Sequence, residues 1–241
     1  MRSHGLLALF FVALLVRPAL ATTSHPDVFG PNFSFTGIQE TTSTGDVEPL
    51  YGAPTGSGDQ LDFSPTSFSA SSSNGSPLDQ TASQLQLLIT ALDPGTPIEE
   101  IVIQESGQTD FTGTGTDTTG AFVSISGLLT VLEATGPLPA GPIGFVATFA
   151  PTDLFGLVST PGSTAWAGSV VIDVAAAAVG VTKAMLSLNN FLNAASEADS
   201  TASISKTSLS IAVVPEPGSL SLVAFGLLGL AMRARRRTLE A

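Results

Sequence analysis

The chain has 241 residues, of which 43% are hydrophobic, and it contains no cysteine. This length and apolar content exclude disorder throughout and allow a packed core, while the missing cysteine excludes disulfides, thiolate nucleophiles and Cys-ligated metal sites. Between Thr22 and Val214 there are 18 acidic residues and two lysines, a net charge of −16. Such a surface repels phosphate backbones, so nucleic acid is excluded as a partner.

The first 21 residues follow the three-part pattern of a secretory signal peptide. Arg2 gives the positive start, an apolar run of 11 residues extends from Leu6 to Val16, and small residues follow at Ala19 and Ala21. We expect signal peptidase to cleave after Ala21, because small side chains fit its shallow pockets. A retained anchor is the alternative, but the apolar run is shorter than the roughly 20 residues that span a bilayer.

The body, residues 22–213, shows the two-residue periodicity of β-strands separated by turn-rich segments. Leu85, Leu87 and Ile89 alternate with polar residues, and the segments around Val170–Val174 and Lys206–Val213 alternate in the same way. In the last segment we expect Leu209, Ile211 and Val213 on the core face and Lys206 on the polar face. Further strands are expected at Asn32–Gly37, Leu61–Ala70, Ile98–Glu105, Phe122–Ile125, Gly127–Glu133, Ile143–Phe149 and Thr182–Leu192.

About eight or nine strands at this spacing predict an all-β fold, an antiparallel β-sandwich of jelly-roll type. The segment Ala175–Gly180 fits either a short helix or the edge of a strand. The glycine- and threonine-rich segment Phe111–Gly120 lacks the Gly-Lys-Ser/Thr ending of a phosphate loop, so we expect a flexible loop or hairpin there.

The C-terminal segment, residues 214–241, has three parts in a fixed order. Val214-Pro215-Glu216-Pro217-Gly218 comes first, the apolar run Ser219–Met232 follows, and a basic tail of residues 233–241 ends the chain. As a helix the apolar run is about 21 Å long, against a hydrocarbon core of about 30 Å, so it predicts a marginal transmembrane span. Four arginines orient the tail toward the cytoplasm: Arg233, Arg235, Arg236 and Arg237. The prolines are expected to keep residues 214–218 extended and out of the preceding sheet.

This arrangement resembles the PEP-CTERM sorting signal of Gram-negative, biofilm-forming bacteria. The resemblance implies that the membrane transpeptidase exosortase recognises Pro215, Glu216 and Pro217 and cleaves nearby. It also implies export through the inner membrane, transient anchoring by residues 219–232, and a final place at the cell surface or in the extracellular matrix. The alternative is a proline-rich linker before an ordinary single-pass anchor.

Few residues of the body suggest catalysis or metal binding. His25 is expected to be a mobile residue near the mature N-terminus. Glu99, Glu100, Glu105 and Asp110 lie on or beside one predicted strand, where two could form a glycosidase pair or bind calcium. A solvated strand edge is the simpler interpretation, so we expect no catalytic, cofactor-binding or metal-binding residues.

Two large amphipathic aromatic residues, Tyr51 and Trp166, are the only candidates for sugar platforms. Trp166 is expected to fill the core instead. We therefore expect a non-enzymatic exported protein of the cell envelope or extracellular matrix. The alternative is a carbohydrate-binding β-sandwich whose partner is the matrix exopolysaccharide.

Overall fold

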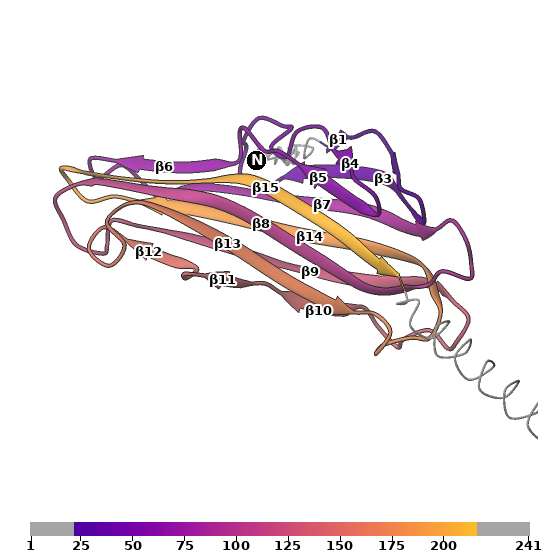
Figure 1. Cartoon of the computed structure of the whole chain (residues 1–241). Helices are drawn as coiled ribbons and strands as arrows, with labels where there is room; N and C mark the ends of the chain where they lie inside the picture. Colours follow the sequence, from indigo (N-terminus) through magenta and orange to yellow (C-terminus); the bar gives the residue numbers. More distant parts are fainter. Residues whose placement is uncertain (1–21, 216–241) are drawn as a thin grey trace, which may run out of the picture.

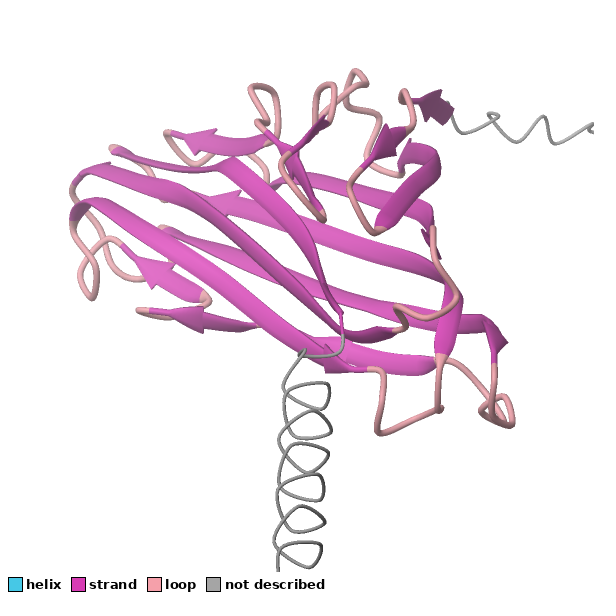
Figure 2. Ribbon diagram, turned by 45° about the vertical axis from the view of Figure 1, so that its right-hand side comes forward, coloured by secondary structure: helices cyan, strands magenta, loops and turns pink. Residues whose placement is uncertain are grey.

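The computed structural model describes residues 22–215, which form two antiparallel sheets packed face to face (Figure 1). The ribbon of Figure 2 shows long strands crossing the whole length of the domain, with short strands and loops at its margins. Among the described residues, no helix is both long and apolar enough to cross a membrane. The expected antiparallel β-sandwich is confirmed.

The first sheet has the path β1-β3-β7-β14-β9-β10, with β2 paired to β3 and β12 paired to β9. Its eight strands are β1 (Thr22–Ser24), β2 (Val28–Phe29), β3 (Phe33–Thr42), β7 (Asp79–Ala91), β9 (Gly120–Ala134), β10 (Ile143–Val146), β12 (Leu154–Gly156) and β14 (Val181–Ala195).

The second sheet has the path β11-β13-β8-β15-β5-β4, with β6 paired to β15. Its seven strands are β4 (Thr55–Gly56), β5 (Gln60–Phe63), β6 (Ser69–Ser73), β8 (Ile98–Gly113), β11 (Thr148–Ala150), β13 (Gly162–Asp173) and β15 (Ser200–Pro215).

The core lies between the sheets and follows the expected alternation. Leu85, Leu87 and Ile89 of β7 are buried, as are Leu209 and Ile211 of β15. The long strands therefore present one apolar face to the opposite sheet and one polar face to solvent. The core is one continuous apolar cluster that draws residues from both sheets.

Several predicted strand boundaries are wrong for identifiable reasons. Ile143–Phe149 is not one strand, because the chain passes from β10 in one sheet to β11 in the other at Ala147. Leu61–Ala70 is likewise divided into β5 and β6. The segments Phe122–Ile125 and Gly127–Glu133 are a single strand, β9, and Ala175–Gly180 forms turns rather than a helix or a strand edge.

Candidate functional site

The last long strand, β15, runs directly into the predicted sorting segment. Val214 pairs with Glu100 and Pro215 pairs with Ile98, with a register irregularity between the two pairs. The expectation that residues 214–218 stay out of the sheet is therefore wrong for its first two residues. Proline is tolerated here because it ends the strand beside an irregularity, where a missing amide costs little. Glu216, Pro217, the apolar run and its arginines, and Ala19 and Ala21 lie outside the described residues.

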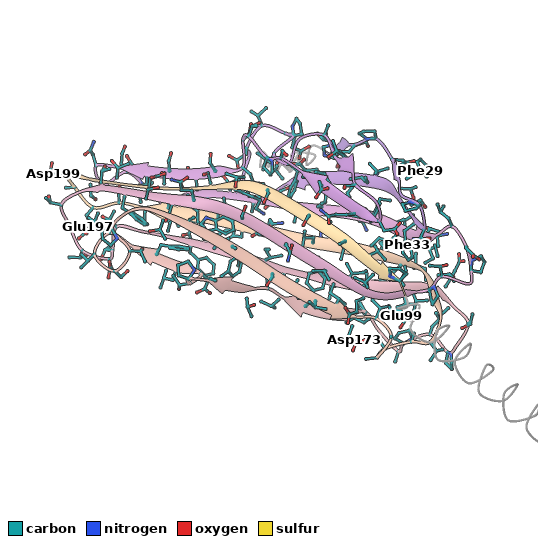
Figure 3. All side chains as sticks on the ribbon, viewed as in Figure 1. Phe29, Phe33, Glu99, Asp173, Glu197 and Asp199 are labelled. Atoms are coloured by element: carbon teal, nitrogen blue, oxygen red, sulfur yellow. The ribbon has the colours of Figure 1, made fainter. Side chains whose placement is uncertain are left out.

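A small acidic hollow borders this strand end. It has a volume of about 200 Å³, and its lining includes Glu99, Glu100, Asp173, Val214 and Pro215. Figure 3 labels Glu99 and Asp173 at this end of the sandwich and Glu197 and Asp199 at the opposite end. Within residues 22–215, no three His, Cys, Asp or Glu side chains are grouped so as to hold a metal ion.

The four predicted carboxylates do not form one site. Glu105 faces the core and is 2% exposed, whereas Glu100 and Asp110 face solvent on the same strand. Glu100 and Asp110 are solvated as expected, but the expected strand edge is wrong, because β8 lies between β13 and β15. For Glu105 the solvated interpretation is wrong altogether. Because Glu105 lies inside the sandwich, it cannot form a glycosidase pair with the exposed acids across a bound sugar.

The two candidate sugar platforms are both inside the protein. Trp166 is 2% exposed and Tyr51 is fully buried. The expected core role of Trp166 is confirmed: its ring packs against Phe149, with 6.1 Å between the ring centroids. Since neither ring reaches solvent, neither can stack on a polysaccharide.

The segment Phe111–Gly120 contains the end of β8, the start of β9 and, between them, the loop of residues 114–119 that its composition predicts. This loop is held in place at its centre. The backbone amide and the hydroxyl of Thr116 donate hydrogen bonds to Glu197, at 2.5 and 3.0 Å. The hydrogen bond from the Thr116 backbone amide in particular lowers the pKa of the Glu197 carboxyl. A carboxylate of the protein thus occupies the donors that a phosphate loop would offer to a ligand.

His25 is not the mobile residue that its position predicts. Its side chain is 4% exposed, and its Nε2 lies 3.1 Å from Oε2 of the buried Glu40. Oε1 of Glu40 also accepts a hydrogen bond from the amide of Leu50, at 2.6 Å. These contacts fasten the start of the described chain to β3 and to the loop that follows it.

A polar cluster in the centre of the core is the most unusual feature of the molecule. Lys206 of β15 is completely buried; its Nζ contacts Oε2 of Glu105 on β8 and donates a hydrogen bond to Oδ1 of Asn190 on β14. Asn190 is 2% exposed, and its Nδ2 donates to the hydroxyl of Tyr51 at 2.9 Å. Apart from the contact with Lys206, neither oxygen of Glu105 has a hydrogen-bond partner among residues 22–215.

Aromatic rings enclose this amine. Nζ of Lys206 lies 4.5 Å from the ring centroid of Phe68 and 5.5 Å from that of Tyr51. Burial lowers the pKa of Lys206 and raises that of Glu105, and their mutual attraction only partly opposes both shifts. Burial also raises the pKa of Tyr51 well above its ordinary value. The low-polarity surroundings therefore favour the neutral forms of all three groups.

The sequence-based alternation placed Lys206 on the outer face, and the structure corrects this. A bulge between Lys206 and Ser208 reverses the alternation along β15, so that Ala202, Ile204 and Lys206 face inward before it and Leu209 faces inward after it. The sequence does carry the signal, because Ile204 and Leu209 are an odd number of positions apart. An odd interval between buried positions requires one extra residue in the strand.

Another surface hollow lies on the outer face of the second sheet. It has a volume of about 470 Å³ and is bounded by β8, β13, β15 and β11. Small polar side chains line much of it, among them Gln104, Ser106, Ser169, Ser208 and Ser210. Such a surface can donate and accept hydrogen bonds.

Fold and sequence together define the class of protein: an all-β sandwich whose last strand continues into a C-terminal sorting signal. A family model described as the PEP-CTERM protein-sorting motif matches residues 213–237. The chain therefore carries this motif, which implies an exported protein that is processed by exosortase and sorted to the cell surface. No protein of curated function matches the chain.

Similarities to solved structures are remote. The enzymatically active domain of tailspike protein 4 of bacteriophage CBA120 is 14% identical with a TM-score of 0.23; 81% of this chain aligns, spanning only 19% of that chain. The xylan-binding module CBM15 is 15% identical with a TM-score of 0.27, covering 83% of this chain and 100% of that one. The family 11 xylanase from Neocallimastix patriciarum is 8% identical with a TM-score of 0.20, covering 81% and 100%. Similarities this weak carry no functional argument.

Proposed function

We propose that this protein is a non-enzymatic β-sandwich of the cell envelope or extracellular matrix, delivered by exosortase processing of its C-terminus. The observation that carries the proposal is the PEP-CTERM motif at residues 213–237, which begins within the last three residues of β15. In this proposal, residues 219–232 hold the chain in the inner membrane, and Arg233, Arg235, Arg236 and Arg237 keep the tail cytoplasmic until cleavage.

The interior and surface of the sandwich support a non-enzymatic role. Glu105 is enclosed in the core, and His25 is held by Glu40. The fold itself fits the expected jelly-roll type, because the long strands from β7 to β15 alternate between the two sheets along the chain. We therefore assign the sandwich a structural role, with its surface exposed to the matrix.

Sorting can be tested by replacing Pro215, Glu216 and Pro217 together with alanine in the native cell. We expect the variant to accumulate uncleaved in the inner membrane, because the recognised segment is lost while the apolar run remains. The matched control replaces Pro137, Leu138 and Pro139, an exposed Pro-x-Pro segment between β9 and β10. Cell fractionation with immunodetection reads the result, and normal surface delivery of the first variant would contradict the proposal.

Binding of matrix polysaccharide is the second candidate, and the hollow on the second sheet is the observation that favours it. We expect Gln104→Ala to weaken retention on immobilised exopolysaccharide from the same cell by several-fold if this hollow binds it. Gln84→Ala, an exposed glutamine on the other sheet, is the matched control. Equal retention of both variants and the unchanged chain would remove this candidate.

A further inference from the structure

The buried cluster brings together three groups that can react with one another. The amine of Lys206 touches the side-chain amide of Asn190 on one side and the carboxyl of Glu105 on the other. Because Nζ is in hydrogen-bond contact with Oδ1, the amide carbon Cγ, which is bonded to Oδ1, is within close reach. Tyr51 accepts a hydrogen bond from Nδ2 and so fixes which end of the amide faces the amine.

An ordinary core does not need this arrangement. A buried carboxylate usually accepts several hydrogen bonds, but Glu105 has only its contact with Lys206 among the described residues. Lys206 is one of two lysines in the body, and the other, Lys183, is on the surface. Burying such a pair contributes little or negative stability compared with apolar residues of the same size, so the cluster calls for a chemical explanation.

The protonation states that burial favours are those required for an amine to attack an amide and displace ammonia. A neutral lysine is a nucleophile, whereas the ammonium form is not, and desolvation is a recognised way to activate a lysine. A protonated glutamic acid can donate to an amide as it is attacked. Burial lowers the pKa of Lys206 and raises that of Glu105, which favours these two forms. The aromatic rings of Phe68 and Tyr51 exclude water from the amine.

We propose that Lys206 and Asn190 become joined by an intramolecular isopeptide bond, with Glu105 as the catalytic acid and base. The reaction is a single turnover of the chain on itself, so it is compatible with a protein that has no external substrate. It does not depend on the sorting function proposed above.

The reaction balances without any co-reactant. The neutral pair forms when Glu105 takes one proton from the Lys206 ammonium within their contact. Nζ then attacks Cγ of Asn190 with its lone pair, moving the carbonyl electrons onto Oδ1. The carbonyl then re-forms, the Cγ–Nδ2 bond breaks and its electron pair leaves with the nitrogen. Glu105 gives its proton to Nδ2 as this bond breaks, then takes a second proton from Nζ and passes it on as well, so the nitrogen departs as ammonium and the third lysine proton remains on the new amide. Glu105 is left as it began.

The bond would connect the two sheets covalently. Asn190 lies on β14 of the first sheet and Lys206 on β15 of the second, and β15 is the strand that leads into the sorting motif. A tension applied to the C-terminus would therefore reach both sheets through a covalent link. In a chain without cysteine, an isopeptide bond is a covalent cross-link that reductants do not cleave.

The test is tandem mass spectrometry of the full-length chain, digested after denaturation. We expect a branched peptide that joins Lys206 to Asn190 and is lighter by one ammonia than its two linear parts. Peptide-level assignment is essential, because succinimide formation at Asn74-Gly75 would cause the same loss of mass elsewhere. An amine-labelling reagent applied in denaturant should modify Lys183 and leave Lys206 unmodified.

Glu105→Gln keeps the size of the side chain but removes the acid and base. This variant should therefore yield only linear peptides, in which the amine of Lys206 is free. Asn189→Ala and Glu133→Gln, at exposed positions, should keep the branched peptide. Linear peptides with a free Lys206 amine from the folded, unaltered chain would overturn the proposal, whatever the variants do. A branched peptide from Glu105→Gln would overturn the role assigned to Glu105.

Discussion

Replacing Lys206 with methionine should lower the free energy of unfolding by about 3–5 kcal/mol, because it leaves the buried Glu105 without its partner. Lys206 is completely buried and contacts Glu105 and Asn190. Urea denaturation followed by the fluorescence of Trp166, the single tryptophan, measures the change. Lys183→Met is the control: Lys183 forms an exposed pair with Glu133, so we expect a change of less than about 1 kcal/mol.

A double variant separates the ion pair from the isopeptide bond. If the cluster is only an ion pair, Lys206→Met combined with Glu105→Leu should restore nearly the original stability, because two apolar residues replace two buried charges. If the bond forms, the double variant should remain about 3 kcal/mol less stable, because it has lost a covalent closure between residues 16 positions apart. An unchanged stability of the single variant would contradict the structural account of the cluster.

Gly107→Ala should destabilise the sandwich by about 3 kcal/mol or more, because the added methyl group has no space. A Cβ at Gly107 would lie 2.0 Å from the carbonyl oxygen of Ser205 and 2.3 Å from Cζ2 of Trp166. The oxygen belongs to the neighbouring strand and cannot move without breaking the sheet. The substitution would therefore displace Trp166 or separate β8 from β15 next to the buried Lys206.

Gly141→Ala is the matched control for this prediction. Gly141 lies in the loop before β10, and a Cβ built there meets no atom within 4 Å. We expect its unfolding midpoint in urea to stay close to that of the unaltered chain. If Gly107→Ala also unfolds at the same urea concentration as the unaltered chain, the close approach of Trp166 to β8 is wrong.

The sequence predicts the fold class well because the sandwich rests on simple alternation. Leu85, Leu87 and Ile89 lie in the core where their spacing places them, and Val171 is exposed where the pattern makes it face outward. Local composition cannot show where a strand leaves one sheet for the other. The passage between β10 and β11 at Ala147 is one such point, because which sheet a segment joins depends on distant partners.

The sorting motif could be read from the sequence because its signal is contiguous. The buried cluster could not, because Glu105, Asn190 and Lys206 come from three strands on two sheets. Their meeting depends on the bulge after Lys206, which turns the amine inward, and on the packing of β14 over β15. The interval between Ile204 and Leu209 indicates the bulge, but it does not indicate which residues the amine would meet.

The most direct test of the sorting account is to determine the C-terminal residue of the mature protein, isolated from the surface of its own cells, by mass spectrometry. The account predicts a chain that begins at residue 22 and ends in or close to residues 214–218, with the apolar run and the arginine tail removed. A mature chain that begins at residue 22 and still ends beyond Arg237 would contradict it.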